Sequence, residues 1–250
     1  MGEELRTIAI IQARFSSTRL PGKIMLELGG KPVIINIVER VVKAETVDEV
    51  VVATSDDTSD DKVELMLKKY GIQCFRGNLN NVLERYYLCA KDYNADIVIR
   101  LTGDNALVAP ELIDEAVDVF GRSYIDYLLY KSTLPIGMCV EVFTFEALKK
   151  AYFGATDREC LEHVTPYIRC NPEMFKVLIY DDKDGKDCSE LRLTIDTRED
   201  FELISKIYNC FDNNMFSYGE LLSLLAKNPN FKLINNRIVQ KVVAYKGEDV

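Results

Sequence analysis

The feature that most constrains this chain is the alternation of short β-branched runs with amphipathic stretches over its first half. Thr7–Gln12, Glu49–Thr54 and Asp96–Thr102 are too short for helices and carry mostly apolar residues, as expected of strands that are buried on both faces. Between the first two, Lys31–Ala44 places valine and isoleucine at helical spacing. Strands that alternate with helices predict a mainly parallel sheet covered on both faces.

The remaining elements complete this prediction. The expected helices are Asp60–Tyr70, Val82–Tyr93, one that begins at Pro110, Asp157–Arg169 with a proline inside, Asp200–Phe211 and Tyr218–Ala226, and the expected strands are Ile72–Phe75, Met138–Phe145, Phe175–Tyr180 and Leu191–Ile195. There is no Pro/Gly/Ser-rich linker and no internal repeat. We therefore expect one Rossmann-like three-layer α/β/α domain with a mainly parallel mixed sheet over residues 1–229, followed by a C-terminal tail, residues 230–250.

Charge and cysteine content exclude several classes of protein. With 31 basic and 40 acidic residues the net charge is −9, whereas nucleic acid and anionic membrane surfaces both require a basic face on their partner. No apolar run reaches the roughly 20 residues of a membrane span, and the N-terminus does not resemble a signal peptide. The seven cysteines are widely spaced, odd in number and without a C-x-x-C pair, which favours reduced thiols over disulfides or zinc. We expect a cytoplasmic protein.

The loop after the first predicted strand carries most of the chemistry, because open parallel sheets bind ligands at the carboxyl ends of their strands. Residues 12–23 read QARFSSTRLPGK, so that Arg14, Arg19 and Lys23 lie among serines and a Pro-Gly turn. These cations can neutralise a triphosphate, while Ser16, Ser17 and backbone amides can donate hydrogen bonds to it. The pattern is neither the Walker motif nor G-x-G-x-x-G, which argues against a P-loop NTPase or an ordinary NAD enzyme. A solvated basic loop is the alternative interpretation.

A family resemblance makes this more specific. Residues 10–23, with IIQAR, STR and LPGK, resemble the opening signature of the cytidylyltransferases that make CMP-KDO and CMP-sialic acids, closest to the branch of spore coat polysaccharide biosynthesis protein F. The likeness continues, in the family's order, at residues 51–55 (VVATS), 75–77 (FRG), 82–87 (VLERYY), 100–104 (RLTGD), 140–143 (VEVF), 162–167 (EHVTPY) and 191–197 (LRLTIDT). It covers roughly residues 7 to 210. The first signature is specific, whereas the later ones would be weak alone.

The resemblance implies the nucleotide-diphospho-sugar transferase fold and a reaction for surface polysaccharide biosynthesis. The acceptor hydroxyl attacks the α-phosphorus of CTP in line and pyrophosphate leaves, so that the protein contributes positioning and charge neutralisation. Arg14, Arg19 and Lys23 would hold the triphosphate, and Lys23 would stabilise the departing pyrophosphate. The nucleotide-binding residues implied in this way are Ala13, Arg14, Ser17, Arg19, Lys23, Arg85 and Gly103, with Arg85 near the base or ribose. Arg14, Lys23 and Asp104 are the expected catalytic residues.

Two aspartates are the predicted ligands of Mg²⁺. Asp104 follows the strand Asp96–Thr102, and Asp196 follows the predicted strand Leu191–Ile195, so both side chains can face the same crevice. Two carboxylates from different strand ends suit Mg²⁺, which takes oxygen ligands and keeps several waters. The alternatives are that Asp104 is a turn residue and that Asp196 is the N-cap of the next helix.

The acceptor side is less sharply defined. By the resemblance, Glu141, Glu162 and His163 border the pocket of a sugar-like acceptor, although a lone histidine such as His163 is also typical of a structural position. The family further implies a homodimer.

The chain departs from the family pattern in two places. Residues 105–109 read NALVA where the branch usually carries a proline and an acidic residue, and Ile136 and Cys139 replace usual acidic residues. These changes predict an altered acceptor or weakened activity. Two alternatives therefore stand beside a cytidylyltransferase: an enzyme that uses another nucleotide or a phosphorylated polyol, phosphonate or sugar phosphate, and a nucleotide-binding protein that does not catalyse.

Overall fold

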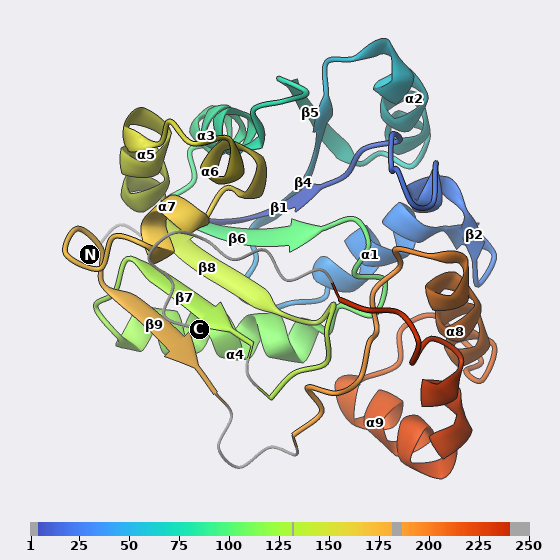
Figure 1. Cartoon of the computed structure of the whole chain (residues 1–250). Helices are drawn as coiled ribbons and strands as arrows, with labels where there is room; N and C mark the ends of the chain where they lie inside the picture. The colour runs from blue at the N-terminus through green and yellow to red at the C-terminus, as the bar shows by residue number, and fades with distance from the viewer. Residues whose placement is uncertain (1–4, 132, 182–186, 241–250) are drawn as a thin grey trace.

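A mixed seven-stranded sheet runs through the middle of the molecule (Figure 1). The computed structural model describes residues 5–131, 133–181 and 187–240. In spatial order the strands are β5 (Gln73–Gly77), β4 (Glu49–Ser55), β1 (Thr7–Gln12), β6 (Ile97–Thr102), β8 (Val140–Thr144), β7 (Tyr127–Tyr130) and β9 (Val177–Tyr180). β8 is antiparallel to its neighbours β6 and β7, and the other pairs are parallel. The predicted mainly parallel mixed sheet is confirmed.

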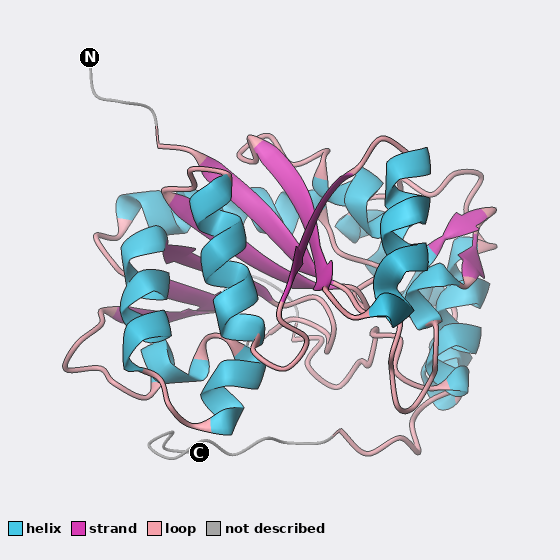
Figure 2. Cartoon of the chain, turned by 90° about the horizontal axis from the view of Figure 1, so that it is seen from above, coloured by secondary structure: helices cyan, strands magenta, loops and turns pink. Residues whose placement is uncertain are grey.

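Helices cover both faces of this sheet, as Figure 2 shows from above. One apolar cluster contains residues of α1 (Val33–Val41), α2 (Asp61–Lys69), α4 (Pro110–Arg122), α8 (Arg198–Tyr208) and α9 (Tyr218–Lys227). The cluster on the opposite face is built with α3 (Val82–Asp92), α5 (Phe145–Gly154), α6 (Arg158–His163) and α7 (Pro166–Arg169). The inner strands thus bury both of their faces, which is why their sequences are apolar nearly throughout, whereas the edge strands β5 and β9 are partly exposed. The three-layer α/β/α fold is confirmed.

The order of the strands reverses at β1. From β1 the chain runs outward to β4 and β5, and it then returns to form β6 on the other side of β1. Gln12, the last residue of β1, pairs with Ala53 of β4 and with Thr102 of β6. The loops that follow β1 and β6 therefore begin side by side at a topological switch point, where sheets of this kind bind ligands.

The segment Leu191–Ile195, which we predicted as a strand, is not one. It makes a single parallel bridge between Arg192 and Ile136, and the Ile195 amide donates to the carbonyl of Asp104 at 2.9 Å. Leu193 and Ile195 are nevertheless buried. The alternation of apolar residues therefore reflects burial of an extended segment beside the carboxyl end of β6, without a ladder of its own.

Other elements also differ from the prediction, which did not include the two-stranded sheet of β2 (Glu27–Leu28) and β3 (Lys31–Pro32). The single helix expected over Asp157–Arg169 is two helices, α6 and α7, because Val164 takes a φ of 71° and Pro166, which has no amide hydrogen, begins the second helix. β7 and α5 were missed. α5 follows β8 without a connecting loop, because Thr144 both ends the strand and caps the helix by accepting from the Ala147 amide at 3.1 Å. With no loop residues between them, the change from the alternating pattern of a strand to the spacing of a helix is not visible in the sequence.

The C-terminal part packs against the domain as far as it is described. A 3-10 helix, η3 (Pro229–Leu233), follows α9, Phe231 and Ile234 contact the larger apolar cluster, and Asn235 is buried. Residues 241–250 of the predicted tail lie outside the described residues, and the boundary at residue 229 stays a prediction. The seven cysteines are thiols that form no disulfide. Within the described ranges, the helices are too short or too polar to cross a membrane.

Candidate active site

Two small residues bring the loops after β1 and β6 together. The Gly103 amide donates to the carbonyl of Gln12 at 2.8 Å, and the Ala13 amide donates to the carbonyl of Ala53 at 3.1 Å. A Cβ on Gly103 would lie 3.0 Å from the Cβ of Ala13 and 3.2 Å from the Gln12 carbonyl oxygen. The close approach of the two backbones therefore requires glycine at this position. Ala13, only 2% exposed, and Gly103 form the floor between the loops.

Asp60 holds the middle of the loop after β1, a role that the sequence analysis missed. This buried carboxylate accepts from the Phe15 amide at 2.7 Å through Oδ1, and through Oδ2 from the amide and hydroxyl of Ser55. The loop then closes through Gly22, whose amide donates to the Phe15 carbonyl at 3.0 Å and whose φ is 70°. In the sequence Asp60 is one of several acidic residues in a row, so nothing there distinguishes it.

Lys23 lies between the two predicted metal ligands. Its Nζ donates to Asp104 Oδ2 at 2.9 Å, to Asp196 Oδ1 at 2.9 Å and to the carbonyl of Ile195 at 2.7 Å. The side chains of Lys23, Asp104 and Asp196 are 11%, 24% and 13% exposed. The structure thus brings both aspartates to one point, where a single positive charge is bound between two carboxylates.

Burial and ion pairing oppose each other in this cluster. Burial disfavours the charged form of Lys23, but the charges of Asp104 and Asp196 outweigh it and raise the pKa of the ammonium. Burial likewise acts to raise the pKa of Asp104, yet Lys23 and the Thr102 hydroxyl, which donates to Asp104 Oδ1 at 2.5 Å, lower it overall. Lys23 and Asp104 are therefore both ionised at neutral pH.

Asp196 is surrounded by cations. Its Oδ2 forms an ion pair with Arg19 Nη2 at 2.9 Å and accepts a hydrogen bond from Arg192 Nη2 at 3.2 Å, so that with Lys23 three basic side chains contact one carboxylate. The alternative that Asp196 caps the next helix is wrong, because Thr197 is the N-cap of α8 and accepts from the amide of Asp200. The side chain of Asp196 is thus oriented by these three cations and not by the helix.

Arg14 and Arg85 meet at one backbone carbonyl. Arg14 Nη1 donates to the Leu79 carbonyl at 3.3 Å, and Arg85 Nη2 donates to Leu79 at 3.1 Å and to Asn78 at 2.6 Å. Arg85 is fully buried, and burial, followed by the charge of Arg14, lowers its pKa to about 10. Among the described residues no carboxylate pairs with either guanidinium. Arg85 supports the loop before α3, and its predicted contact with the nucleotide is untested.

The residues predicted for the acceptor side lie near the helices on the α3 face. Arg100 of β6 and Glu141 of β8 form an ion pair of 2.8 Å across the sheet, with side chains 14% and 13% exposed. Glu162 and His163 are half-buried at the end of α6. Burial lowers the pKa of His163, Glu162 acts to raise it and Arg100 to lower it further, so the imidazole is neutral at pH 7.

The two departures from the family pattern have structural consequences. Ala106 to Ala109 are at most 2% exposed and belong to the core, so the loss of an acidic residue there extends the apolar packing. With its amide oriented for hydrogen bonding, Asn105 donates to Asp104 Oδ1 at 3.2 Å and to the Gly137 carbonyl at 3.1 Å. Cys139 is half-buried, and burial, followed by the charge of Glu141, raises its pKa to about 11. It is an uncharged thiol at neutral pH.

Asp104 and Asp196 could hold a divalent cation as a pair. No group of three or more His, Cys, Asp or Glu side chains with metal-ligand geometry is found in the described part of the chain. A two-carboxylate site suits Mg²⁺, which commonly takes only one or two protein carboxylates and keeps waters and phosphate oxygens as its other ligands. The Lys23 ammonium between the two oxygens shows that a cation fits there.

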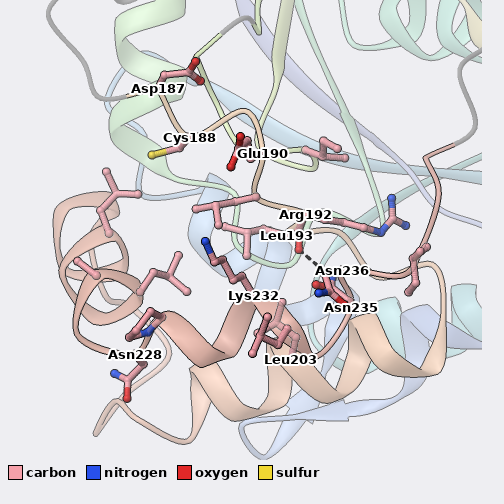
Figure 3. Close-up of a pocket in the computed structure, with 18 of the residues that line it drawn as sticks. Asp187, Cys188, Glu190, Arg192, Leu193, Leu203, Asn228, Lys232, Asn235 and Asn236 are labelled. Carbon is pink, nitrogen blue, oxygen red and sulfur yellow. Dashed lines mark hydrogen bonds between the residues drawn. The ribbon is translucent and has the colours of Figure 1, made fainter.

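A cavity of about 690 Å³ lies next to this cluster, between α8, α9, the segment 187–193 and the C-terminal residues (Figure 3). Leucines form much of its wall, and none of the predicted site residues lines it. Arg192 belongs to both places, because it lines the cavity and its guanidinium reaches Asp196.

Comparisons with known proteins are consistent with this geometry. The family model described as "Cytidylyltransferase" matches residues 8–247. The chain is 37% identical over 227 residues to the spore coat polysaccharide biosynthesis protein SpsF of Bacillus subtilis (88% of this chain, 94% of SpsF). It is 38% identical over 237 residues to an uncharacterised protein of Methanocaldococcus jannaschii (95% of this chain, 97% of that one).

A solved structure agrees. The structure of a cytidylyltransferase from Leptospira borgpetersenii superposes with a TM-score of 0.87 at 37% identity, covering 95% of this chain and all of that one. The resemblance drawn from the sequence motifs is therefore confirmed, and the chain belongs to the cytidylyltransferase family.

Proposed function

We propose that this protein transfers CMP from CTP to a sugar acid or a related acceptor in surface polysaccharide biosynthesis, with Mg²⁺ as cofactor and pyrophosphate as the second product. The observation that carries the proposal is the position of Lys23, whose ammonium lies 2.9 Å from both Asp104 and Asp196 at the switch point of the sheet. An ammonium between two carboxylates, beside two further arginines, is an arrangement suited to a nucleoside triphosphate with its metal.

The basic side chains of the loop would bind the phosphates. The side chain of Arg19 is 39% exposed and, within the described ranges, is paired with Asp196 alone, so it can turn toward a triphosphate without leaving a buried charge unpaired. Lys23, which stays positively charged, would exchange its carboxylate partners for phosphate oxygens and neutralise the charge that develops on the departing pyrophosphate. Arg14, which follows Ala13 in the chain and donates to the Leu79 carbonyl, would be the third cation.

Asp104 and Asp196 would hold the Mg²⁺ ion. When bound, this ion supplies charge neutralisation on the phosphate oxygens and makes the α-phosphorus more electrophilic. The protein's own part is to keep the carboxylates aimed at one point, which Thr102 and Asn105 do for Asp104 through their hydrogen bonds.

The acceptor would bind on the β6–β8 side of the crevice. Its hydroxyl must reach the α-phosphorus in line with the leaving pyrophosphate, and the charged pair Arg100–Glu141, with Glu162 and His163 nearby, provides polar groups for a sugar ring. The neutral imidazole of His163 can accept a hydrogen bond. The uncharged Cys139 favours an acceptor different from that of relatives with an acidic residue at this position.

The test is a pyrophosphate-release assay with Mg²⁺, each of CTP, UTP, GTP and ATP, and a panel of sugar acids and sugar phosphates. We expect release with CTP and at least one sugar acid, and a loss of about a hundredfold or more in Asp104→Asn. Asp118→Asn is the control, because Asp118 forms an exposed ion pair with Arg122 on α4, and its activity should stay within about twofold.

Three results would contradict the proposal in different ways. Release with another triphosphate but not with CTP would show that the nucleotide is wrong. Release only with a phosphorylated polyol, phosphonate or sugar phosphate would move the protein to the second enzyme class. Binding of CTP in calorimetry without pyrophosphate release from any acceptor would favour a non-catalytic nucleotide-binding protein.

A further inference from the structure

Arg192 is a buried arginine that no part of the proposed reaction uses. Its side chain is 6% exposed. Nε and Nη2 donate to the two oxygens of Asp200 at 2.9 Å each, and Nη2 also donates to Asp196 Oδ2 at 3.2 Å. The guanidinium is therefore bound in a fixed plane by a bidentate contact, and from that plane it reaches a proposed ligand of the metal.

Asp200 orients the backbone on which Asp196 is carried. Its Oδ2 accepts from the amides of Asp196 and Thr197 at 3.0 Å each, and its own amide donates to the Thr197 hydroxyl. Arg192 thus acts on Asp196 in two ways, through the side chain directly and through Asp200 on the main chain. Both contacts leave Asp196 Oδ1 directed at Lys23.

The three cations around Asp196 differ in whether they can leave. Arg19 and Lys23 belong to the loop that would bind phosphates, so a triphosphate competes for both of them. Arg192 cannot leave in this way, because its departure would leave the fully buried carboxylate of Asp200 without a positive partner. With nucleotide bound, Arg192 is the positive partner that stays on Asp196.

The C-terminal segment holds Arg192 in turn. The Asn235 amide donates to the Arg192 carbonyl at 3.0 Å and to Asp200 Oδ1 at 2.8 Å, and Gln240 accepts from Arg192 Nη1. Figure 3 shows Asn235 beside Arg192 at the wall of the cavity, joined by a dashed line. Asn235 is itself only 3% exposed.

We propose that Arg192, supported by Asn235, is the positioning residue that keeps Asp196 aimed at the divalent cation once nucleotide has drawn the loop cations away. The proposal rests on the function proposed above, because it takes Asp196 as a ligand of that cation. Groups that orient metal ligands typically change metal affinity by about 10- to 100-fold when they are removed.

The experiment measures CTP binding by isothermal titration calorimetry without acceptor, once with EDTA and once with saturating Mg²⁺. The ratio of the two dissociation constants reports how much the cation tightens CTP, and it does not require turnover. For Arg192→Lys, which keeps the charge but not the bidentate plane, we expect this ratio to fall about tenfold while the dissociation constant in EDTA stays within about twofold. In Asp196→Asn the ratio of the two dissociation constants should fall by the same factor or by more.

Arg40→Lys is the matched control for the loss of a buried guanidinium. Arg40 is 1% exposed and donates to the carbonyls of Val108, Asn214 and Phe216. We expect it to lower the melting temperature but to leave the Mg²⁺ ratio unchanged. If Arg192→Lys does not fold, Asn235→Ala provides the same test, with an expected loss of about threefold in the ratio.

The outcomes separate this inference from the proposed function. The role of Arg192 would be overturned if the Mg²⁺ effect on CTP affinity disappeared in Asp196→Asn but was unchanged in Arg192→Lys, or in Asn235→Ala where that variant is used. The metal site itself would then still be supported. A wild-type protein whose CTP affinity is the same with and without Mg²⁺ would overturn both. A fall in the ratio for Arg192→Lys but not for Arg40→Lys supports the inference.

Discussion

Replacement of Lys23 by methionine tests the arrangement on which the site depends. The change removes the charge but keeps an unbranched side chain of similar length. Asp104 and Asp196 are then left ionised on either side of an apolar group, with side chains 24% and 13% exposed. Asp196 keeps its contacts with Arg19 and Arg192, whereas Asp104 keeps uncharged donors such as Thr102 and Asn105.

The magnitude follows from these contacts. Two unit charges 2.9 Å apart attract by about 6 kcal/mol at an effective dielectric constant of about 20. Desolvation of the three groups offsets most of this gross attraction, and loss of one partner from a buried ion pair costs about 3–5 kcal/mol. Because Asp196 retains two arginines, we expect the free energy of unfolding of Lys23→Met to be about 3 kcal/mol below that of the wild type at pH 7.

This deficit should shrink in acid. In the wild type the pKa of Asp104 is lowered, so its stabilising contribution is present above the unfolded pKa of about 3.9 and is lost as pH falls through the folded value. Without Lys23, we expect burial, the largest influence on Asp104 and one that acts to raise its pKa, to bring that pKa above its unfolded value. The ionised Asp104 then lowers the free energy of unfolding of the variant at neutral pH. This destabilisation disappears as Asp104 is protonated, when pH falls through the raised pKa. The difference from wild type should narrow between pH 7 and about pH 4.

Urea denaturation at both pH values measures these differences. Lys31→Met is the control, because Lys31 Nζ contacts Glu39 at 2.6 and 2.7 Å but both side chains are more than a third exposed (41% and 34%). Such exposed pairs contribute less than about 1 kcal/mol. The reasoning is refuted if Lys23→Met costs no more than Lys31→Met at pH 7, or if its deficit is as large at pH 4.

Three further predictions concern the loops of the site. Asp60→Asn places an amide nitrogen against a backbone donor and should lower the free energy of unfolding in urea by about 2 kcal/mol. It should also weaken CTP binding, because the loop loses its contact at Phe15, and an unchanged CTP affinity would contradict this. Gly103→Ala should cost about 1–3 kcal/mol and weaken CTP binding, since its Cβ meets Ala13 and backbone; a melting temperature equal to that of the wild type would show that the loops can separate freely. Cys139, whose pKa burial raises to about 11, should react with iodoacetamide at pH 8 far more slowly than free cysteine and faster as pH rises, as followed by peptide mass spectrometry; a rate equal to that of free cysteine would contradict its burial.

The sequence alone determined the elements of the first half of the chain and the chemistry of its first loop. β1 matches its predicted range residue for residue, and β4 and β6 are within one residue at either end. A strand covered on both faces must be apolar nearly throughout, so its limits are visible as a change of composition. The basic loop was visible for the same reason, because it interrupts that pattern with three cations.

The local sequence pattern did not predict features that depend on which residues become neighbours in the folded protein. Leu191–Ile195 alternates like a strand, but no strand lies in position to form a ladder with it, and only one bridge forms. Asp60 and Arg192 have no distinctive pattern around them, although one holds the basic loop and the other holds Asp196. The family motifs included both aspartates without indicating what lies between them.

Tertiary structure decided that Lys23 meets Asp104 and Asp196, which lie 81 and 173 residues away in the chain. The physical reason is the reversal of strand order at β1, which places the loops after β1 and β6 next to each other, and the extended segment before α8, which pairs with the carbonyl of Asp104. Contacts over such separations follow from the order of strands in the sheet, and no local preference of the residues encodes that order.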